Sequence, residues 1–181
     1  MVARRIIIIG NGASGKTWLA GHLARLTGYP LWHLDRQIWR PGWVMTPPDQ
    51  VVAWLQDVMS GDSWIIEGEH DATTEQRFAA ADAVIVMDMN RLLCLWRVLR
   101  RAGSRRPDLP DGMREPRAFS HGFFHYCRHI WHYQDWGRPT ALRLHASWPD
   151  VQFYHVRSKR QAAVLLDGGL GASADVATRA A

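Results

Sequence analysis

The octapeptide at residues 10–17 is the feature that most constrains how this chain can fold. Its sequence, GNGASGKT, matches the pattern GxxxxGKT and directly follows an aliphatic run at residues 6–9. Apolar residues at helical spacing after it predict a helix over residues 17–26. A strand, a glycine-rich turn and a helix in this order form a loop whose backbone N–H groups can hold a phosphate chain. The alternative is a glycine-rich turn that matches the pattern by chance.

The residues of this octapeptide have distinct expected roles toward a bound polyphosphate. Its glycines allow a tight loop that points backbone N–H groups inward, and the following helix adds the positive end of its dipole. Lys16 would reach the outer phosphates, and the Thr17 hydroxyl would contact Mg²⁺. The chain has only two lysines against twenty arginines, and one of the two falls at this position. The nucleotide-binding residues expected here are Gly10, Asn11, Gly12, Ala13, Ser14, Gly15, Lys16 and Thr17.

Apolar periodicity divides the chain into alternating strands and helices. Strands are expected over residues 4–9, 31–34, 63–66, 83–87 and 151–156. Helices are expected over residues 17–26, 47–59, 74–81, 91–101, 118–133, 140–147 and 159–166. Near-continuous aliphatic strands are typical of a sheet that is buried on both faces. We therefore predict an α/β fold with three layers around a mainly parallel five-stranded sheet.

A single domain accounts for most of the 181 residues. We expect it to span residues 1–167, with a mobile, proline-containing surface loop near residues 102–117 and a disordered tail over residues 168–181. No apolar stretch is long enough for a signal peptide or a membrane span, so we expect a soluble cytoplasmic protein without a membrane partner. Cys94 and Cys127 fall in apolar helical segments and are expected to act as small hydrophobic residues. The sequence does not indicate an oligomeric state.

The positive charge of the chain is concentrated in one segment. Lysine and arginine outnumber aspartate and glutamate by 22 to 17, which gives a net charge of +5. Residues 91–117 contain eight arginines and three acidic residues and so carry the same +5, which leaves the rest neutral. A duplex-binding protein usually spreads cations along a face, whereas one short arginine-dense segment suits a small polyanion. DNA is therefore a less favoured partner than a small molecule.

Acidic residues follow three of the expected strands, at the edge where ligands bind in open α/β sheets. They are Asp35, Glu67 and Asp88. Phosphoryl transfer uses one acidic group for the Mg²⁺ shell and often a second to orient the acceptor. We assign Glu67 to the metal and Asp35 to the acceptor and catalysis, and we interpret Asp88 as structural. Capping or salt-bridging roles for Glu67 and Asp35 are the alternatives.

Arginines in the basic segment are placed to form a lid over the phosphates. Arg97 and Arg101 are four residues apart and share a helix face, and Arg105 and Arg106 follow in the polar loop. Guanidinium groups can neutralise charge in a transition state and exclude water when a loop closes. We expect Arg97, Arg101 and Arg106 to be catalytic. The alternative is a solvated helix face with surface arginines.

Further residues bear on the acceptor. Arg77, on the short helix after the third strand, is expected to contact it. Tryptophans near the second strand, Trp43 among them, would line a pocket for a planar or apolar compound, with core packing as the alternative. A histidine stripe also recurs at helical spacing, but the aromatic residues within it favour packing or solvent exposure over a metal site. The stripe comprises His121, His125, His129 and His132.

Several motifs together carry a family resemblance that extends to about Leu166. They are residues 10–17, 33–35, 39, 41–43, 64–68, 92–101 and 106–108. Through them the chain resembles the small kinase-like branch of the P-loop proteins, which includes adenylate kinase and shikimate kinase. It resembles more closely the DNA topology modulation (FlaR-like) family. The resemblance implies a P-loop NTPase fold with an adenylate-kinase-like core, an acceptor-binding segment after the second strand and a small lid. It also implies ATP as the nucleotide, with Arg157 beside the base.

The chain departs from that family at the end of the third strand. The family usually has Asp-Gly-Asn-Tyr there, whereas this chain has Glu67, Gly68, Glu69 and His70. The predicted function is transfer of the γ-phosphoryl group of ATP to a small-molecule acceptor. A nucleoside monophosphate is the acceptor favoured by analogy, and a nucleoside or another hydroxyl compound is the alternative. A second hypothesis is a nucleotide-dependent regulator that acts on DNA topology or a protein partner and uses the loop as a switch.

Overall fold

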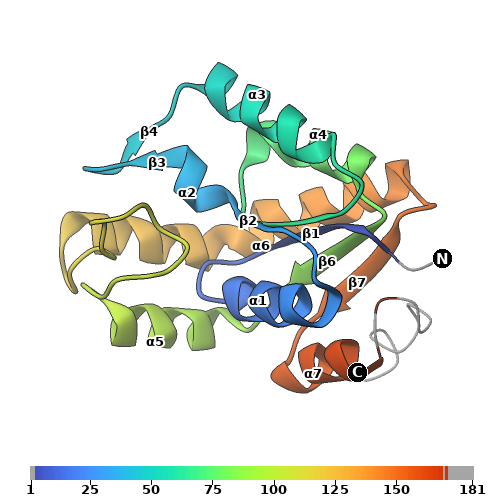
Figure 1. Cartoon of the computed structure of the whole chain (residues 1–181). Coiled ribbons are helices and arrows are strands. Elements are labelled where there is room, and N and C mark those ends of the chain that lie inside the picture. Colours follow the sequence, from blue (N-terminus) through green and yellow to red (C-terminus); the bar gives the residue numbers. More distant parts are fainter. Residues whose placement is uncertain (1–2, 169, 171–181) are drawn as a thin grey trace.

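A five-stranded parallel sheet forms the centre of the computed structural model, which describes residues 3–168 and residue 170 (Figure 1). The strand order is β2-β5-β1-β6-β7, and every neighbouring pair is parallel. The strands are β1 (Arg5–Gly10), β2 (Leu31–His33), β5 (Trp64–Glu67), β6 (Ala83–Met87) and β7 (Gln152–Val156). The predicted α/β fold with a parallel five-stranded sheet is confirmed.

Helices cover both faces of the sheet and give the three expected layers (Figure 1). Ile6 and Ile8 of β1 pack on the face covered by α1 and α7, while Ile7 and Ile9 pack on the face covered by α3 and α4. Each of these fully buried side chains contributes about 2 kcal/mol of hydrophobic stabilisation. The helices are α1 (Lys16–Thr27), α2 (Leu34–Ile38), α3 (Pro48–Met59), α4 (Asp71–Ala80), α5 (Arg91–Arg101), α6 (His121–Ser147) and α7 (Lys159–Gly168).

The segment after β2 differs from the sequence-based expectation. No helix or strand was expected over residues 35–46, but the chain forms helix α2 and a hairpin of β3 (Trp39–Arg40) and β4 (Val44–Met45) there. Asp35 therefore lies in the first turn of α2 rather than at the end of a strand. The expectation failed because α2 contains little more than one turn, which is too short for apolar periodicity to indicate it.

One continuous helix, α6, replaces the two helices expected over residues 118–133 and 140–147. Pro139 lies inside it, and a proline usually interrupts a helix because it lacks an N–H group and its ring clashes with the preceding turn. Buried side chains lie on both sides of the proline, among them Tyr133 and Ala141. Packing against the rest of the molecule therefore holds the helix continuous through a residue that disfavours it.

The remaining elements lie close to the expected ranges, although α4 begins three residues early. The expected tail over residues 168–181 falls outside the described residues, except for Gly168, which ends α7, and Leu170, which is buried in the core. Cys94 is buried and Cys127 is half-buried, and both are free thiols. None of the helices in the described part of the chain combines the length and apolarity needed to cross a membrane.

The carboxyl ends of the strands bring the expected site residues to one edge of the sheet. The octapeptide leaves β1 there, α2 follows β2, and Glu67 ends β5. Helix α6 passes the same edge, where the Asn11 side-chain amide donates a hydrogen bond of 3.0 Å to the Ile130 carbonyl. This bond ties the octapeptide to α6.

Candidate active site

The octapeptide forms a compact loop between β1 and α1 that only glycine can complete at its first position. Gly10 has φ of +140°, and a Cβ atom there would lie 2.4 Å from the Met87 carbonyl oxygen. The ammonium of Lys16 donates to the carbonyls of Gly10 and Asn11, at 2.7 and 2.8 Å. The lysine therefore lies over the loop, in the position from which it can reach a bound phosphate chain.

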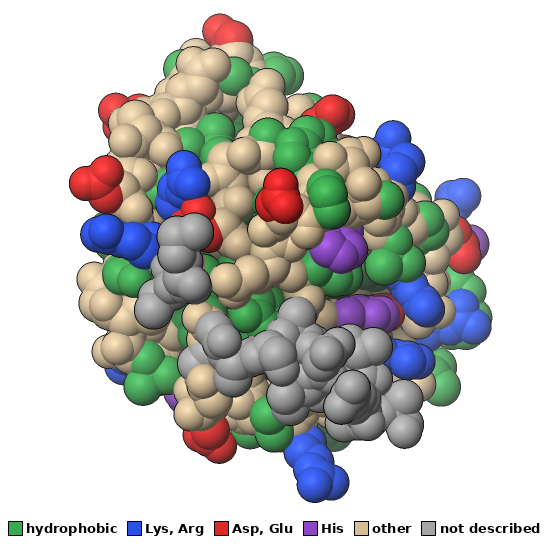
Figure 2. Space-filling model, turned by 90° about the vertical axis from the view of Figure 1, so that its right-hand side faces the viewer, with side chains coloured by type: hydrophobic (Ala, Val, Ile, Leu, Met, Phe, Trp, Pro, Cys, Tyr) green, Lys and Arg blue, Asp and Glu red, His purple; other side chains and the backbone are tan. Residues whose placement is uncertain are grey.

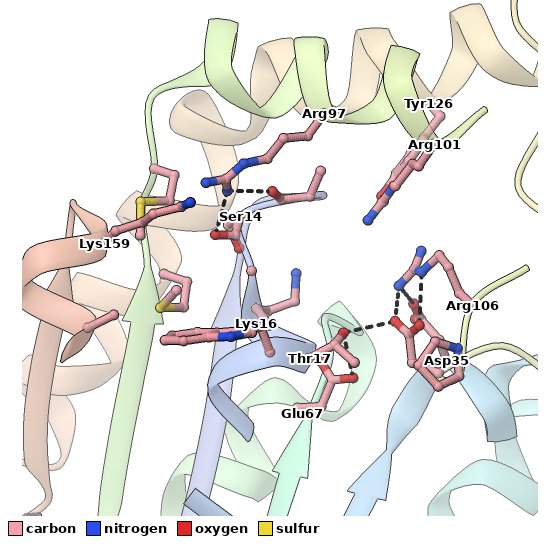
Figure 3. Close-up of a pocket in the computed structure, with 18 residues that line it drawn as sticks. Ser14, Lys16, Thr17, Asp35, Glu67, Arg97, Arg101, Arg106, Tyr126 and Lys159 are labelled. Atoms are coloured by element: carbon pink, nitrogen blue, oxygen red, sulfur yellow. Dashed lines mark hydrogen bonds and ion pairs between the residues drawn. The ribbon is translucent and has the colours of Figure 1, made fainter. Parts of the chain in front are cut away.

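A cavity of about 560 Å³ opens at this loop (Figure 3). Most of the expected site residues line it, and in Figure 3 Lys159 lies at the opposite end from Asp35 and Arg106. Its lining is Ala13, Ser14, Gly15, Lys16, Thr17, Trp18, Asp35, Glu67, Met87, Met89, Arg97, Arg101, Arg106, Pro107, Asp108, Tyr126, Lys159 and Ala162. We call it the donor cavity.

Oxygen atoms gather around the Thr17 hydroxyl, where Mg²⁺ was expected. The hydroxyl donates to Glu67 Oε1 at 3.2 Å and is 3.0 Å from Asp108 Oδ2. Glu67 is buried, and its Oε1 atom also pairs with His33 Nδ1 at 2.7 Å, which fixes the carboxylate toward the threonine. Hard oxygen donors of this kind fit Mg²⁺.

The protein alone does not complete a metal shell at this position. No group of three histidine, cysteine or acidic side chains within the described ranges is arranged to hold a metal ion. Magnesium often keeps several waters and binds through one or two carboxylates together with substrate phosphates. The oxygens of Thr17 and Glu67 therefore fit an ion that arrives with the nucleotide.

Two arginines of α5 reach the donor cavity, as their spacing predicts. Arg97 Nη1 donates to the carbonyls of Ala13 and Ser14, both at 3.0 Å, so this arginine braces the loop from above (Figure 3). Arg101 Nη2 lies 3.0 Å from the Tyr126 hydroxyl and 3.0 Å from Glu115 Oε1. Both guanidinium groups line the cavity where a polyphosphate would lie.

The segment at residues 102–117 is packed rather than a fully exposed surface loop. Asp108, Leu109 and Glu115 are buried there. Arg106 forms ion pairs with Asp108 and with Glu115, the latter at 2.7 Å. The sequence predicted a mobile surface loop without buried residues, because the composition of the segment does not reveal that its arginines and acids pair with each other. We call this segment the lid.

Burial and neighbouring charges shift the pKa values of the central groups. Burial raises the pKa of Asp35 above its usual value, although Arg106, with Nη2 3.8 Å from Oδ2, opposes the effect. Burial lowers the pKa of Lys16, against the influence of Glu67 and Glu69. Burial also acts against the charged form of Arg106, but nearby Tyr126, Glu115 and Asp35 hold its pKa above the usual value. Because its own pKa is raised, Asp35 is a stronger base than an exposed aspartate.

A second cavity of about 720 Å³ adjoins the donor cavity. Lys16, Asp35 and Tyr126 line both, so the two spaces meet at these side chains. The rest of its wall is mixed and includes three tryptophans, two carboxylates and four histidines. It consists of Gly10, Gly12, Ile38, Trp39, Trp43, Met45, Glu69, His70, Asp71, Pro116, Ser120, His121, Gly122, His125, His129 and Trp136. We call it the second cavity.

Three of the expected site residues lie outside both cavities, namely Asn11, Arg77 and Arg157. Asn11 is buried, and its side-chain amide bonds to α6 instead. Arg77 is fully buried, and its guanidinium donates to the Gly68 and His70 carbonyls at 3.0 and 3.3 Å. Arg157 is exposed, and its backbone N–H donates to the Gln161 side chain at 2.6 Å. For Arg77 the short helix was identified, but α4 turns this side chain into the core.

Several residues that line the site were not singled out for it by the sequence. Tyr126 lies inside a long aromatic stretch, and periodicity does not indicate which described ring of that stretch lines both cavities. Asp108 belongs to the lid and lines the donor cavity, although it was given no role there. Glu115 lines neither cavity but pairs with Arg101 and Arg106. Lys159, one of two lysines in the chain, reaches the donor cavity from the start of α7, and its rarity was an available signal.

Solved structures place the chain among P-loop kinase folds. No family model and no curated protein matches it. A gluconokinase from Sinorhizobium meliloti 1021 matches with a TM-score of 0.51 and 13% identity, over 97% of this chain and 94% of that one. Shikimate kinase from Bacteroides thetaiotaomicron matches with a TM-score of 0.52 and 16% identity, over 92% of this chain and 96% of that one. Shikimate kinase from Acinetobacter baumannii, solved with shikimate, matches with a TM-score of 0.53 and 16% identity, over 91% of this chain and 89% of that one.

These similarities establish the fold. The chain has the α/β fold of P-loop kinases, as the octapeptide and the alternating strands predict. Kinases with this fold act on different acceptors, so the fold does not name the acceptor here.

Proposed function

We propose that this chain is an ATP-dependent phosphotransferase that phosphorylates a small molecule. The observation that carries the proposal is the junction of the two cavities at Lys16, Asp35 and Tyr126. One cavity begins at a phosphate-binding loop and the other provides space for a second ligand. A donor and an acceptor bound in them would meet beside the lysine and the aspartate, which is the proximity that transfer requires.

The chain's own residues account for the transfer step. The acceptor hydroxyl oxygen forms a bond to the γ-phosphorus while the bond to the β–γ bridging oxygen breaks, and ADP leaves. The hydroxyl proton passes to the Asp35 carboxylate, whose raised pKa suits a general base. Lys16, Arg97 and Arg101 stabilise the charge on the phosphates, and Arg106 holds the lid beside Asp35. Thr17 and Glu67 would hold Mg²⁺, and the ion would supply neutralisation of charge on the phosphate oxygens.

The adenine end of ATP is best accommodated away from the lid. Lys159 lies at the end of the donor cavity opposite Asp35 and Arg106 (Figure 3), and Trp18, Met89 and Ala162 also line this cavity. An aromatic ring and apolar side chains suit the planar face of a base. This assignment replaces Arg157, which the resemblance implied.

A screen for phosphoryl transfer tests the proposal. Wild-type protein and Lys16→Ala are incubated with labelled ATP, Mg²⁺ and a panel of hydroxyl compounds. We expect the wild type to label an acceptor, and Lys16→Ala to label none while keeping the wild-type melting curve. A wild type that labels no acceptor across nucleotides, nucleosides, sugars and hydroxy acids would exclude this function.

Regulation of DNA topology has less support as a function. Figure 2 shows one face of the molecule, where acidic and basic side chains are interspersed over the described part of the surface. Sequence-independent DNA binding needs cations spread along a face to match many phosphates. Tight DNA binding that weakens steeply with added salt would favour this alternative.

A further inference from the structure

The second cavity has a charge that suits an acceptor without negative charge. Among the described residues, Lys16 is its one lysine or arginine, beside four histidines, while Asp35, Glu69 and Asp71 supply three carboxylates. The lysine lies at the junction with the donor cavity and bonds to the phosphate-binding loop. No arginine from the described chain lines the second cavity. Arginine is the usual residue for binding carboxylates and phosphates through two hydrogen bonds.

Arg77, on α4 after the turn that carries Glu69 and His70, is committed to structure. Arg77 donates to the backbone of Gly68 and His70 and to Thr74 Oγ1 at 3.1 Å. Burial lowers its pKa to about 10, an effect that nearby Glu69 partly offsets. The guanidinium therefore braces the turn that presents Glu69 and His70 and has no access to a ligand.

Glu69 is the acidic group best placed to meet a ligand in the second cavity. It is half-buried, and its Oε2 atom accepts a hydrogen bond of 3.2 Å from the Gly10 N–H. That bond fixes the carboxylate between the phosphate-binding loop and the second cavity. Burial raises the pKa of Glu69, while Lys16 and Arg77 oppose the effect. A cation bound in the cavity would favour the charged form of this carboxylate.

Three tryptophans line the same cavity as these carboxylates. Trp39 and Trp43 meet edge to face with ring centroids 5.4 Å apart, and Trp136 lies 4.9 Å from the His129 ring. Trp43 adopts φ of +61°, a conformation that costs a bulky residue about 1 kcal/mol or more. Organic cations bind favourably over tryptophan faces.

We propose that the phosphoryl acceptor is an organic cation, namely a hydroxyl compound with an amine or quaternary ammonium group on an apolar or planar body. This inference rests on the kinase function proposed above. The cationic group lies among Glu69, Asp71 and the tryptophan rings, and the hydroxyl group points toward Asp35. The hydroxyl oxygen gains the γ-phosphoryl group, ADP leaves, and the proton passes to Asp35. A nucleoside monophosphate would instead place its phosphate among three carboxylates.

An acceptor screen in three matched charge classes tests this proposal. Each set contains an amino alcohol or aminated sugar, its neutral hydroxyl counterpart and its carboxylate counterpart, and nucleoside monophosphates join the anionic class. We expect the highest kcat/KM in the cationic class. Glu69→Gln should raise the KM of the cationic acceptor about tenfold or more, because it removes a charged partner. The KM for ATP should change little.

Glu75→Gln provides the matched control, because Glu75 is exposed on α4 and lines neither cavity. It should leave all parameters at wild-type values. Should Glu69→Gln fail to fold, Asp71→Asn at an exposed position serves as the second variant, and it should also raise the KM of the cationic acceptor. Highest kcat/KM for an anionic acceptor would overturn this inference while the kinase function stands. Absence of transfer in all three classes would overturn the kinase function itself.

Discussion

The two cavities share three residues but carry opposite charge. In the described part of the chain, the donor cavity has five cationic side chains against three carboxylates, while the second cavity has one lysine against three carboxylates. The first composition suits a polyphosphate, and the second suits a ligand without negative charge. The boundary between them falls at Lys16 and Asp35. The comparison teaches that the site separates its two ligands by charge as well as by position.

The cavities also differ in how the chain builds them. The centre of the donor cavity is one continuous octapeptide. Arg97 of α5 bonds to this octapeptide, and Arg101 of α5 lines the same cavity. The second cavity takes its wall from the α2–β3–β4 segment, the turn after β5, and α6. Variants in each region should therefore affect different steps.

Lys16→Ala should cause the largest effect, because it removes the cation that both cavities share. We expect kcat to fall at least about 100-fold, as for the loss of a group that stabilises transition-state charge. The melting temperature should change little, since within the described part of the chain the ammonium bonds to two loop carbonyls. Labelled ATP and a melting curve measure both. A folded variant with wild-type turnover would contradict the assigned role.

Glu115→Gln should loosen the lid and thereby weaken the donor side alone. Glu115 is buried and pairs with Arg101 at 3.0 Å and with Arg106 at 2.7 Å. Removing its charge leaves two partly buried cations with a weaker partner, so we expect a loss of about 2 kcal/mol in unfolding free energy. Denaturant titration measures the loss, and kcat should fall with it.

Asp111→Asn is the matched control for the lid. Asp111 lies on the same segment, is fully exposed and pairs with Arg36 at 3.2 Å. This variant should keep wild-type stability and turnover. Equal losses for both variants would show that the buried network does not hold the lid.

The pH dependence of kcat should reveal Asp35 at the boundary between the cavities. A general base must be deprotonated, so kcat should fall as pH falls through the pKa of Asp35. Because burial raises this pKa, the fall should occur above the usual range of an aspartate. In the activity that Arg106→Gln retains, kcat should begin to fall at a higher pH than in the wild type, since Arg106 lowers the pKa of Asp35. A profile that is flat through this range would exclude Asp35 as the base.

Asp82→Asn should give the smallest effect, since it lies away from both cavities. Its carboxylate accepts hydrogen bonds from the Arg4 and Arg5 backbone, at 3.0 and 2.9 Å, and from the Arg5 side chain. Burial raises the pKa of Asp82, but these bonds outweigh it and hold the pKa below its usual value. We expect a loss of about 1 kcal/mol in unfolding free energy at neutral pH, because the pair is partly exposed.

The sign of the Asp82 effect with pH follows from that lowered pKa. The stabilisation is present above the unfolded-state pKa and disappears as pH falls through the folded-state value. The wild type and Asp82→Asn should therefore become equally stable in strong acid, with kcat unaffected at neutral pH. Loss of turnover in folded Asp82→Asn would contradict the expectation that this ion pair acts independently of the two cavities.

The donor side was largely predictable from the sequence because its parts are local. The octapeptide fixes its own loop, and helical spacing places Arg97 and Arg101 on one face. Glu67 ends β5 as expected and bonds to Thr17. Local patterns of this kind survive folding because each depends on a few neighbouring residues.

The second cavity was not predictable because distant packing creates it. Periodicity cannot indicate a helix as short as α2, which carries Asp35, nor a helix that continues through Pro139. The direction of Arg77 depends on how α4 sits against the core. Trp43 was expected near an acceptor, and it does line the second cavity, but its role in binding stays a prediction.

A calorimetric titration of the protein with ATP and Mg²⁺ tests the central claim most directly, since both proposals need a nucleotide held by the octapeptide. We predict one binding site per chain in the wild type and much weaker binding in folded Lys16→Ala. Absence of ATP binding to the wild type, or equal affinity in the variant, would contradict the account.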